Sequence, residues 1–259
     1  MSEPVTVHTN GPITQLTLNR PDKFNCLSQA MLKGLLDGIT QAEMTPGVRV
    51  VVISSKGSHF CTGADLDEVQ GHRESRERLN EFIAFGHHVM QRMENSPLPV
   101  ITAVQGYCLA GGMELMMTAD IVFSAADARI GCQHAKYGLV PGWGGSQRLP
   151  RLVGMRRAME LMFSARWLDA ETAADWGLVN VVVDASKLLD EVGAFAQQLS
   201  TRNPESIGAM KRLVREGASL AIPAALELEQ SIAVPALMSD KVAEGLRAFQ
   251  DRREPQFSN

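Results

Sequence analysis

In "YCLAGGMELMMTAD", Tyr107–Asp120, nearly every residue is apolar or small, yet a carboxylate, Glu114, stands in the middle. Two glycines, Gly111 and Gly112, come shortly before it. Burying an unpaired carboxylate costs free energy, so a carboxylate in such surroundings indicates either a structural partner or a chemical task.

The residues around Glu114 predict a strand, a glycine turn and then a helix that begins near Gly111. A buried strand within Pro97–Gly106 precedes the turn. The first N–H groups of a helix have no partner inside it and attract negative charge. Glu114 lies about one turn after Gly111, so its side chain faces the same opening. From this segment alone, a catalytic Glu114 and a Glu114 that caps its own helix are equally favoured.

A second loop of small residues, "HFCTGADLDEV" (His59–Val69), follows another buried strand at Val48–Ser55. Its "TGAD" tract offers backbone N–H groups with little side-chain cover. Two such loops, each after a buried parallel-type strand, are expected to meet at the edge of an α/β core where ligands bind. Two N–H groups that converge from separate loops form an oxyanion hole.

The rest of the chain predicts an α/β core in which strands and helices alternate to about Val183, followed by a mostly helical region. Asp169 is expected to cap a short helix that ends before Gly177. The other expected strands are Ile13–Arg20, two short strands within Asp120–Cys132, and Leu178–Val183; the other expected helices are Gln29–Ala42, the charged stretch around Gly71–Phe82, the tract after Pro141, and the chain from Ser186 onward, with Leu188, Leu189, Val192, Phe195, Ala196 and Leu199 on one face.

Composition excludes several classes of protein. The chain has 259 residues, 45% hydrophobic and 21% charged, without an apolar run long enough to span a membrane. Its first residues have neither a basic start nor an apolar segment, so no signal peptide is expected. The net charge is −4 and the basic residues are scattered, which argues against a nucleic-acid partner.

The sequence also lacks the usual signatures of metal and cofactor sites. The four cysteines form no CxxC pair and are expected to be free thiols in a reducing cytoplasm. No HExxH, GxSxG, Walker A or GxGxxG sequence is present. We therefore expect no metal and no cofactor.

Four motifs in order, "HFCTGADLDEV", "VQGYCLAGGMELMMTADIVFSA", "GLVPGWGGSQRLPRLVG" and "ETAADWGLVNVVV", resemble the crotonase superfamily of enoyl-CoA hydratases and isomerases. The similarity extends from "LNRPDKFNCLS" to "GLRAFQDRREPQF". The resemblance implies a spiral of ββα turns over residues 1–195, and a helical region over residues 196–259 that builds trimers, often paired into hexamers. It also implies an acyl-CoA thioester substrate whose enolate is stabilised, with coenzyme A as part of that substrate.

Residue by residue, the resemblance places Ala64 and Gly111 as the two backbone donors to the thioester oxygen. Glu114 falls on the first of the two acid/base glutamates of the hydratases. Arg252 falls where many members reach the CoA phosphates of a neighbouring subunit. The other residues implied in substrate or CoA binding are Lys23, Phe24, Asp65, Leu66, Tyr137, Trp143 and Phe249.

The sequence departs from the family pattern at His134, where hydratases carry the second glutamate. An imidazole can exchange a proton near neutral pH, so His134 either takes part in the chemistry or serves as a neutral hydrogen-bonding residue. Trp143 stands where the family often has a small residue, and either reshapes the acyl pocket or packs in the core.

Hydration of a 2-enoyl-CoA is the reaction that the motifs favour. A double-bond isomerase, a decarboxylase or a thioester hydrolase would use the same Ala64 and Gly111. A non-catalytic acyl-CoA binder or an RNA-binding relative is less favoured, because Glu114 is intact and the charge is balanced.

Overall fold

The structure is a computed structural model that describes residues 3–257, and it has the mixed α/β architecture that the sequence predicts. The strands are β1 (Val5–Asn10), β2 (Ile13–Leu18), β3 (Val50–Ser55), β4 (Val100–Val104), β5 (Tyr107–Leu109), β6 (Ile121–Ala125), β7 (Arg129–Gly131), β8 (Leu168–Asp169) and β9 (Val181–Val183). The α-helices are α1 (Gln29–Met44), α2 (Leu66–His72), α3 (Arg76–Glu94), α4 (Gly111–Met116), α5 (Gly145–Val153), α6 (Met155–Ser164), α7 (Ala170–Asp175), α8 (Leu188–Ser200), α9 (Pro204–Gly217), α10 (Ile222–Leu237) and α11 (Asp240–Asp251). Short 3-10 helices are η1 (Pro21–Lys23), η2 (His134–Tyr137) and η3 (Ala185–Lys187).

The strands form two sheets. The larger has the order β1-β2-β3-β4-β6-β9, in which only the β1–β2 pair is antiparallel. The smaller has the order β5-β7-β8, with β5 and β7 parallel. From β4 to β7 the chain places one strand in each sheet in turn, which is the ββα repeat of the predicted spiral.

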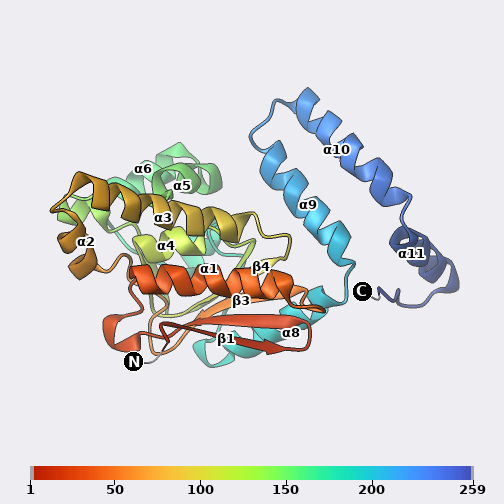
Figure 1. Ribbon diagram of the computed structural model, residues 1–259, viewed down its shortest axis with the longest axis horizontal. Helices are drawn as coiled ribbons and strands as arrows, with labels where there is room; N and C mark the ends of the chain where they lie inside the picture. The colour runs from red at the N-terminus through yellow and green to blue at the C-terminus, as the bar shows by residue number, and fades with distance from the viewer. Residues whose placement is uncertain (1–2, 258–259) are drawn as a thin grey trace.

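Helices cover both faces of the larger sheet. Figure 1 shows α1 and α3 on one side and α8 on the other. Successive side chains of a strand point to opposite faces, so a strand between two layers is apolar throughout. In β3, Val51 and Ile53 join the main core, whereas Val50 and Val52 pack with Leu188 of α8 in a second cluster.

Gly106 makes the sharp turn that carries the chain from β4 in one sheet to β5 in the other. Its φ is +54°, in the left-handed region that favours glycine. A Cβ there would lie 2.0 Å from the backbone oxygen of Ser58. The close approach brings the loop after β3 beside the turn after β4, and thereby joins the two parts of the candidate site.

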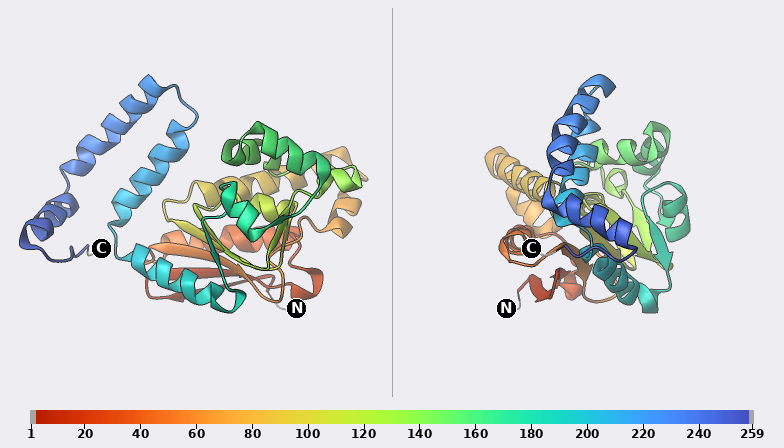
Figure 2. Two further views of the ribbon diagram at one scale, coloured as in Figure 1. Left: turned by 180° about the vertical axis from the view of Figure 1, so that it is seen from behind. Right: turned by 90° about the vertical axis from the view of Figure 1, so that its right-hand side faces the viewer.

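The last three helices extend away from the core (Figures 1 and 2). Helices α9 and α10 run antiparallel and form a hairpin. Helix α11 follows the C-terminal end of α10, on the side away from the core. Large apolar side chains are exposed along these helices: Met210, Val214, Leu226, Leu237, Met238 and Phe249.

Most element predictions are confirmed, including the cap at Asp169, whose carboxylate accepts from Thr172 N. Strand β1 was not predicted from the sequence. Leu189 was predicted on the packed face of α8, and this prediction is wrong, because the structure leaves it exposed. The predicted boundary at residue 195 lies inside α8, and the division into two domains stays a prediction. Among residues 3–257, no helix is both long and apolar enough to cross a membrane.

Candidate active site

Two backbone N–H groups lie side by side where the loop after β3 meets α4. A Cβ added at Gly111 would lie 3.2 Å from Ala64 N, and one added at Gly63 would lie 3.2 Å from Gly111 N. Gly111 is the first residue of α4, so its N–H has no acceptor within the helix. The loop pairs with Leu27 through the residues on either side of Ala64: Leu27 N donates to Gly63 O, and Asp65 N donates to Leu27 O. The N–H of Ala64 takes no part in this pairing.

Local backbone features force these two donors together. A Cβ at Gly112 would lie 2.2 Å from Cys61 O, so only glycine lets α4 approach this loop. Ala110, just before Gly111, has a φ of +49° and a ψ of −119°, a conformation that costs about 1–3 kcal/mol in a residue with a side chain. Its N–H donates to Gly131 O at 2.9 Å, which fixes the strained residue to β7.

Glu114 lies beside this pair and is 2% exposed. Its Oε1 accepts hydrogen bonds from Trp143 N at 2.8 Å and from Gly145 N at 2.7 Å. Gly145 is the first residue of α5, so the carboxylate caps the start of α5 rather than its own helix. The other oxygen, Oε2, faces His134 Nε2 at 3.8 Å.

Burial is the largest influence on the Glu114 carboxyl and raises its pKa above the ordinary 4.5. The hydrogen bonds from Gly145 and Trp143 and the charge of Arg148 oppose this shift. The pKa of Glu114 is therefore higher than that of an exposed glutamate, and its ionised form is less strongly favoured. Such a group can both take and return a proton, as general acid–base catalysis requires.

His134, the first residue of η2, stands next to Glu114 as the sequence position suggested. Its imidazole is largely buried, which lowers its pKa below the ordinary 6.5 and keeps the ring neutral at neutral pH. Its Nδ1 lies 3.2 Å from the Sγ of Cys132. One ring nitrogen thus faces a thiol and the other faces the carboxylate.

The indole of Trp143 lies next to Gly111, and the residue is 2% exposed. A Cβ at Gly111 would lie 3.0 Å from its Cζ3, and one at Gly86 in α3 would lie 2.0 Å from its Nε1. The ring also packs edge-on against Phe82, with 5.4 Å between centroids. Trp143 is therefore packed in the core beside Gly111, and its role in shaping an acyl pocket stays a prediction.

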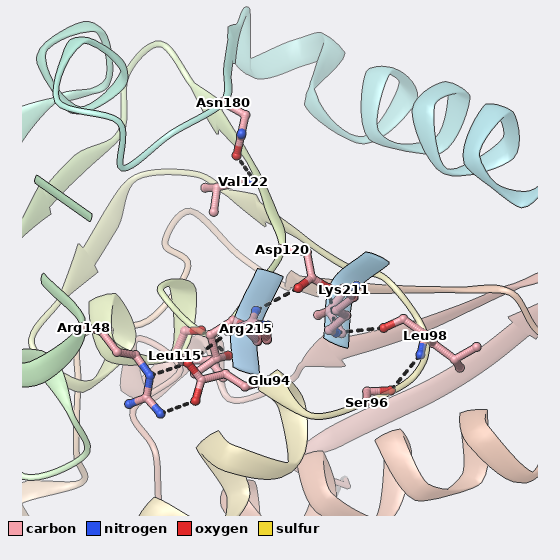
Figure 3. A network of polar contacts seen from close by, with 12 residues as sticks. Glu94, Ser96, Leu98, Leu115, Asp120, Val122, Arg148, Asn180, Lys211 and Arg215 are labelled. Carbon is pink, nitrogen blue, oxygen red and sulfur yellow. Dashed lines mark hydrogen bonds and ion pairs between the residues drawn. The ribbon is translucent and has the colours of Figure 1, made fainter. Parts of the chain in front are cut away.

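A chain of ion pairs holds the loop that binds Glu114 (Figure 3). Arg148 donates to Trp143 O at 2.7 Å and makes two hydrogen bonds to the carboxylate of Glu94, at 2.7 and 2.5 Å. Arg215 of α9 bridges Glu94, at 3.3 Å, and Asp120, at 2.7 Å. Lys211 also pairs with Asp120, at 2.7 Å, so the network connects α9 to the loop.

Four predicted CoA-binding residues lie around the loop after β3. Lys23 ends η1 and Phe24 follows it; Thr62 N donates to Phe24 O at 3.2 Å, which joins the two loops. Asp65 caps α2 and pairs with Arg20 at 3.0 Å, so its carboxylate is engaged within the chain. Phe24 and Leu66 are more than half exposed and are free to contact a ligand.

The remaining predicted residues lie at different distances along the fold. Tyr137 ends η2, the short helix that His134 begins, and is exposed. Phe249 and Arg252 lie at the end of α11, at the other side of the molecule from α2 (Figure 1). One chain therefore does not bring these two residues to Glu114.

Sequence reasoning missed three residues that shape the site. Arg148 stands in "GGSQRL", where its charge beside glycines was a usable signal. Gly86 carries no local signal, because its neighbour, the Trp143 ring, comes from a distant segment. Cys132 lies only two residues before His134, but a lone cysteine there forms no motif. Over residues 3–257, no cluster of three or more His, Cys, Asp or Glu side chains has a geometry suited to a metal ion.

Comparison with known proteins agrees with this geometry. A profile of the enoyl-CoA hydratase/isomerase family matches residues 8–259. An enoyl-CoA isomerase/hydratase of Mycosarcoma maydis is 35% identical over 256 residues, 95% of this chain and 92% of that protein. The crotonyl-CoA hydratase of Syntrophomonas wolfei is 32% identical over 98% of each chain. An enoyl-CoA hydratase structure from Bacillus anthracis superposes with a TM-score of 0.93, at 31% identity over 98% of each chain. The predicted fold class and resemblance are thus confirmed, and the chain belongs to the enoyl-CoA hydratase/isomerase family.

Proposed function

We propose that this enzyme is an enoyl-CoA hydratase that adds water reversibly across the double bond of a 2-enoyl-CoA. The observation that carries the proposal is the pairing of two adjacent backbone donors with a buried carboxylate that keeps one oxygen free. The donors suit a thioester oxygen that gains charge, and the carboxylate suits proton transfer beside it.

The reaction follows from these positions. The N–H groups of Ala64 and Gly111 bind the thioester oxygen and stabilise the enolate. Glu114 takes a proton from water through Oε2 while the water oxygen forms a bond to the β carbon. Glu114 then returns that proton to the α carbon as the enolate collapses. The two transfers consume one water and leave the carboxylate as it began.

The cofactor, the assembly and the location belong to the same proposal. Hydration transfers no electrons to an external acceptor, so coenzyme A enters only as part of the substrate and no further cofactor is needed. The exposed apolar side chains of α9–α11 support a homotrimer or hexamer, because burying such surfaces stabilises association. The four free cysteines support a cytoplasmic location.

Double-bond isomerisation is a second candidate, because one carboxylate that moves a proton between two carbons is sufficient for it. With His134 in place of the second glutamate, this reaction would depend on Glu114, as hydration does. The two reactions differ in their product from crotonyl-CoA: hydration removes the conjugated enoyl thioester, whereas an isomerase without water addition largely preserves it.

The test is the absorbance of the enoyl thioester when protein is added to crotonyl-CoA, with product identification by mass. We expect loss of the band, and a rate lower by about 10²–10⁴ in Glu114→Gln with CoA binding unchanged. Glu160→Gln, which alters an exposed carboxylate on α6, serves as the control and should keep the rate. A wild-type protein that leaves crotonyl-CoA unchanged but converts a 3-enoyl-CoA would establish the isomerase instead.

A further inference from the structure

We propose that Cys132 is a positioning residue. It holds His134 in the neutral tautomer in which Nε2 carries the proton and Nδ1 is unprotonated. The thiol and the ring meet closely, with 3.2 Å between Sγ and Nδ1. Cys132 directly follows β7, which pairs with both β5 and β8, so the sulfur is fixed by the smaller sheet. The tautomer of a histidine follows from the hydrogen bond that its second nitrogen makes.

The protonation state of the sulfur favours donation by the thiol in this contact. Burial raises the pKa of the Cys132 thiol to about 11, so the S–H is present at neutral pH. Among the hydrogen bonds of residues 3–257, Nδ1 of His134 is the acceptor within reach of this S–H. A bare Nδ1 gives the S–H a partner, whereas a protonated Nδ1 would leave it without one.

The other side of the ring requires the same tautomer. Oε1 of Glu114 is already occupied by two backbone donors. Oε2, which faces Nε2 at 3.8 Å, accepts no hydrogen bond among the described residues. A proton on Nε2 attracts this oxygen, and a lone pair there would repel it. Cys132 and Glu114 therefore favour one and the same state of the imidazole.

The consequence for catalysis rests on the proposed function. A neutral imidazole with its proton on Nε2 cannot take a proton from water at that nitrogen. It can donate a hydrogen bond to the water oxygen, while Glu114 takes the water's proton and passes it to the α carbon. His134 would thus orient the water, and Glu114 alone would carry the proton in both steps.

The experiment is ¹⁵N NMR of the histidine side chains in the full-length protein, which reveals which ring nitrogen carries the proton. His59 provides an internal reference, because its Nδ1 accepts the backbone N–H of Tyr107 at 3.2 Å and must be bare. The His134 signals are assigned by their loss in His134→Gln. We expect His134 to show the same pattern as His59 in the wild-type protein.

Two variants at Cys132 test the cause. Cys132→Ser keeps a donor and should keep the pattern. Cys132→Ala should lower the ratio of the two tautomers about fivefold, equal to about 1 kcal/mol for one hydrogen bond. The control is Cys108→Ala, which removes a buried thiol that contacts Met116 and no imidazole. With crotonyl-CoA, Cys132→Ala should lower kcat with KM unchanged, and Cys132→Ser should restore it.

A wild-type His134 that carries its proton on Nδ1 would overturn the inference, even if no variant folds. An unchanged tautomer in Cys132→Ala would also overturn it. The NMR spectra test the tautomer of His134, and the crotonyl-CoA assay tests the proposed hydratase activity. The expected spectra from a protein that does not hydrate crotonyl-CoA would support this inference and reject the proposed function.

Discussion

The two oxygens of Glu114 serve different purposes. Oε1 is fixed by the N–H groups of Trp143 and Gly145, whereas Oε2 faces His134 Nε2 at 3.8 Å and accepts no hydrogen bond among the described residues. The first set of contacts holds the carboxylate in place, and the second leaves an oxygen for a substrate or a water. The two oxygens of this carboxylate therefore differ, since the fold holds one and leaves the other without a hydrogen bond.

Removing the charge of Glu114 should stabilise the protein at neutral pH. Its pKa in the folded state is above the unfolded value, so the carboxyl favours the fold only while it is protonated. That contribution is complete below the unfolded pKa and is lost as the pH rises through the folded pKa. In Glu114→Gln the amide oxygen still accepts both N–H groups and no ionisation follows. We expect a higher Tm than wild type near pH 8, and a difference that shrinks toward pH 4, measured by thermal unfolding.

Glu94→Gln is the matched control for this stability measurement. Its carboxylate is partly buried but pairs with Arg148 and Arg215, so loss of the charge should lower Tm at neutral pH. A Glu114→Gln protein that is less stable than wild type near pH 8 would show that the hydrogen bonds of the ionised carboxylate outweigh its burial.

Residue spacing made part of the site predictable. Glu114 and Gly111 lie one helical turn apart, and His134 lies at a fixed distance before Gly138, so both positions could be read along the chain. The hydrogen bonds of Glu114 could not, because its donors come from a loop about thirty residues later whose position depends on α5 packing. Cys132 lies two residues before His134, but their contact depends on the turn into η2, which no sequence motif specifies.

At the level of elements, the loop over residues 141–145 depends on the start of α5. Gly144 has a φ of +103°, and a Cβ there would lie 2.0 Å from Nη1 of Arg148. The guanidinium thus occupies the space beside the glycine and donates to Trp143 O in the same loop. Arg148 therefore controls where the N–H groups that hold Glu114 point.

Arg148→Lys should weaken this control, because an ammonium cannot reproduce the paired hydrogen bonds to Glu94 and the bond to Trp143 O together. We expect kcat on the true substrate to fall about tenfold with KM nearly unchanged, as for a misplaced catalytic group. Weaker N–H bonds should also raise the pKa of Glu114 further, which moves the acid limb of the pH–rate profile upward.

Arg92→Lys is the control for the loop prediction. Arg92 lies on α3 and, like Arg148, pairs with a partly buried glutamate, Glu43, at 2.6 Å, but no hydrogen bond among the described residues joins it to the loop. Its kcat and pH profile should match wild type. An equal fall of kcat in Arg148→Lys and Arg92→Lys would mean that Arg148 contributes only to the stability of the fold.

The sequence predicted the identity of most elements better than their arrangement. The apolar runs of β3 and β4 could be read as buried strands, because helices cover both of their faces. The alternating β1 is an edge strand with mostly exposed or half-buried residues, so its pattern is weak and it was missed. The two short strands β6 and β7 were expected around one turn, yet they belong to different sheets, which no local pattern specifies.

Across the whole molecule, the C-terminal helices combine a polar attachment with an apolar surface. Lys211 and Arg215 connect α9 to Asp120 and Glu94 of the core. Beyond α9, large apolar side chains such as Leu237, Met238 and Phe249 are exposed within one chain. A polar link that orients the hairpin and an apolar face left open are the features expected of a symmetric oligomer.

We therefore expect a trimer or hexamer by light scattering, in which Arg252 reaches the CoA phosphates of a neighbouring subunit. Arg252 has a φ of +55° at the end of α11 and no ion-pair partner among residues 3–257, so its guanidinium is available for a phosphate. Arg252→Ala should raise KM for the CoA thioester several-fold, about 1 kcal/mol per lost charge-assisted contact, with kcat little changed. Arg253→Ala is the control, since Arg253 pairs with Glu244 at 2.7 Å within its own chain and should leave KM unaltered. Within one chain, α11 lies far from α4, which carries Glu114 (Figure 1), so Arg252 can serve this site only from another subunit. A fully active monomer would therefore contradict the contact across subunits. An equal rise of KM in both variants would contradict it as well.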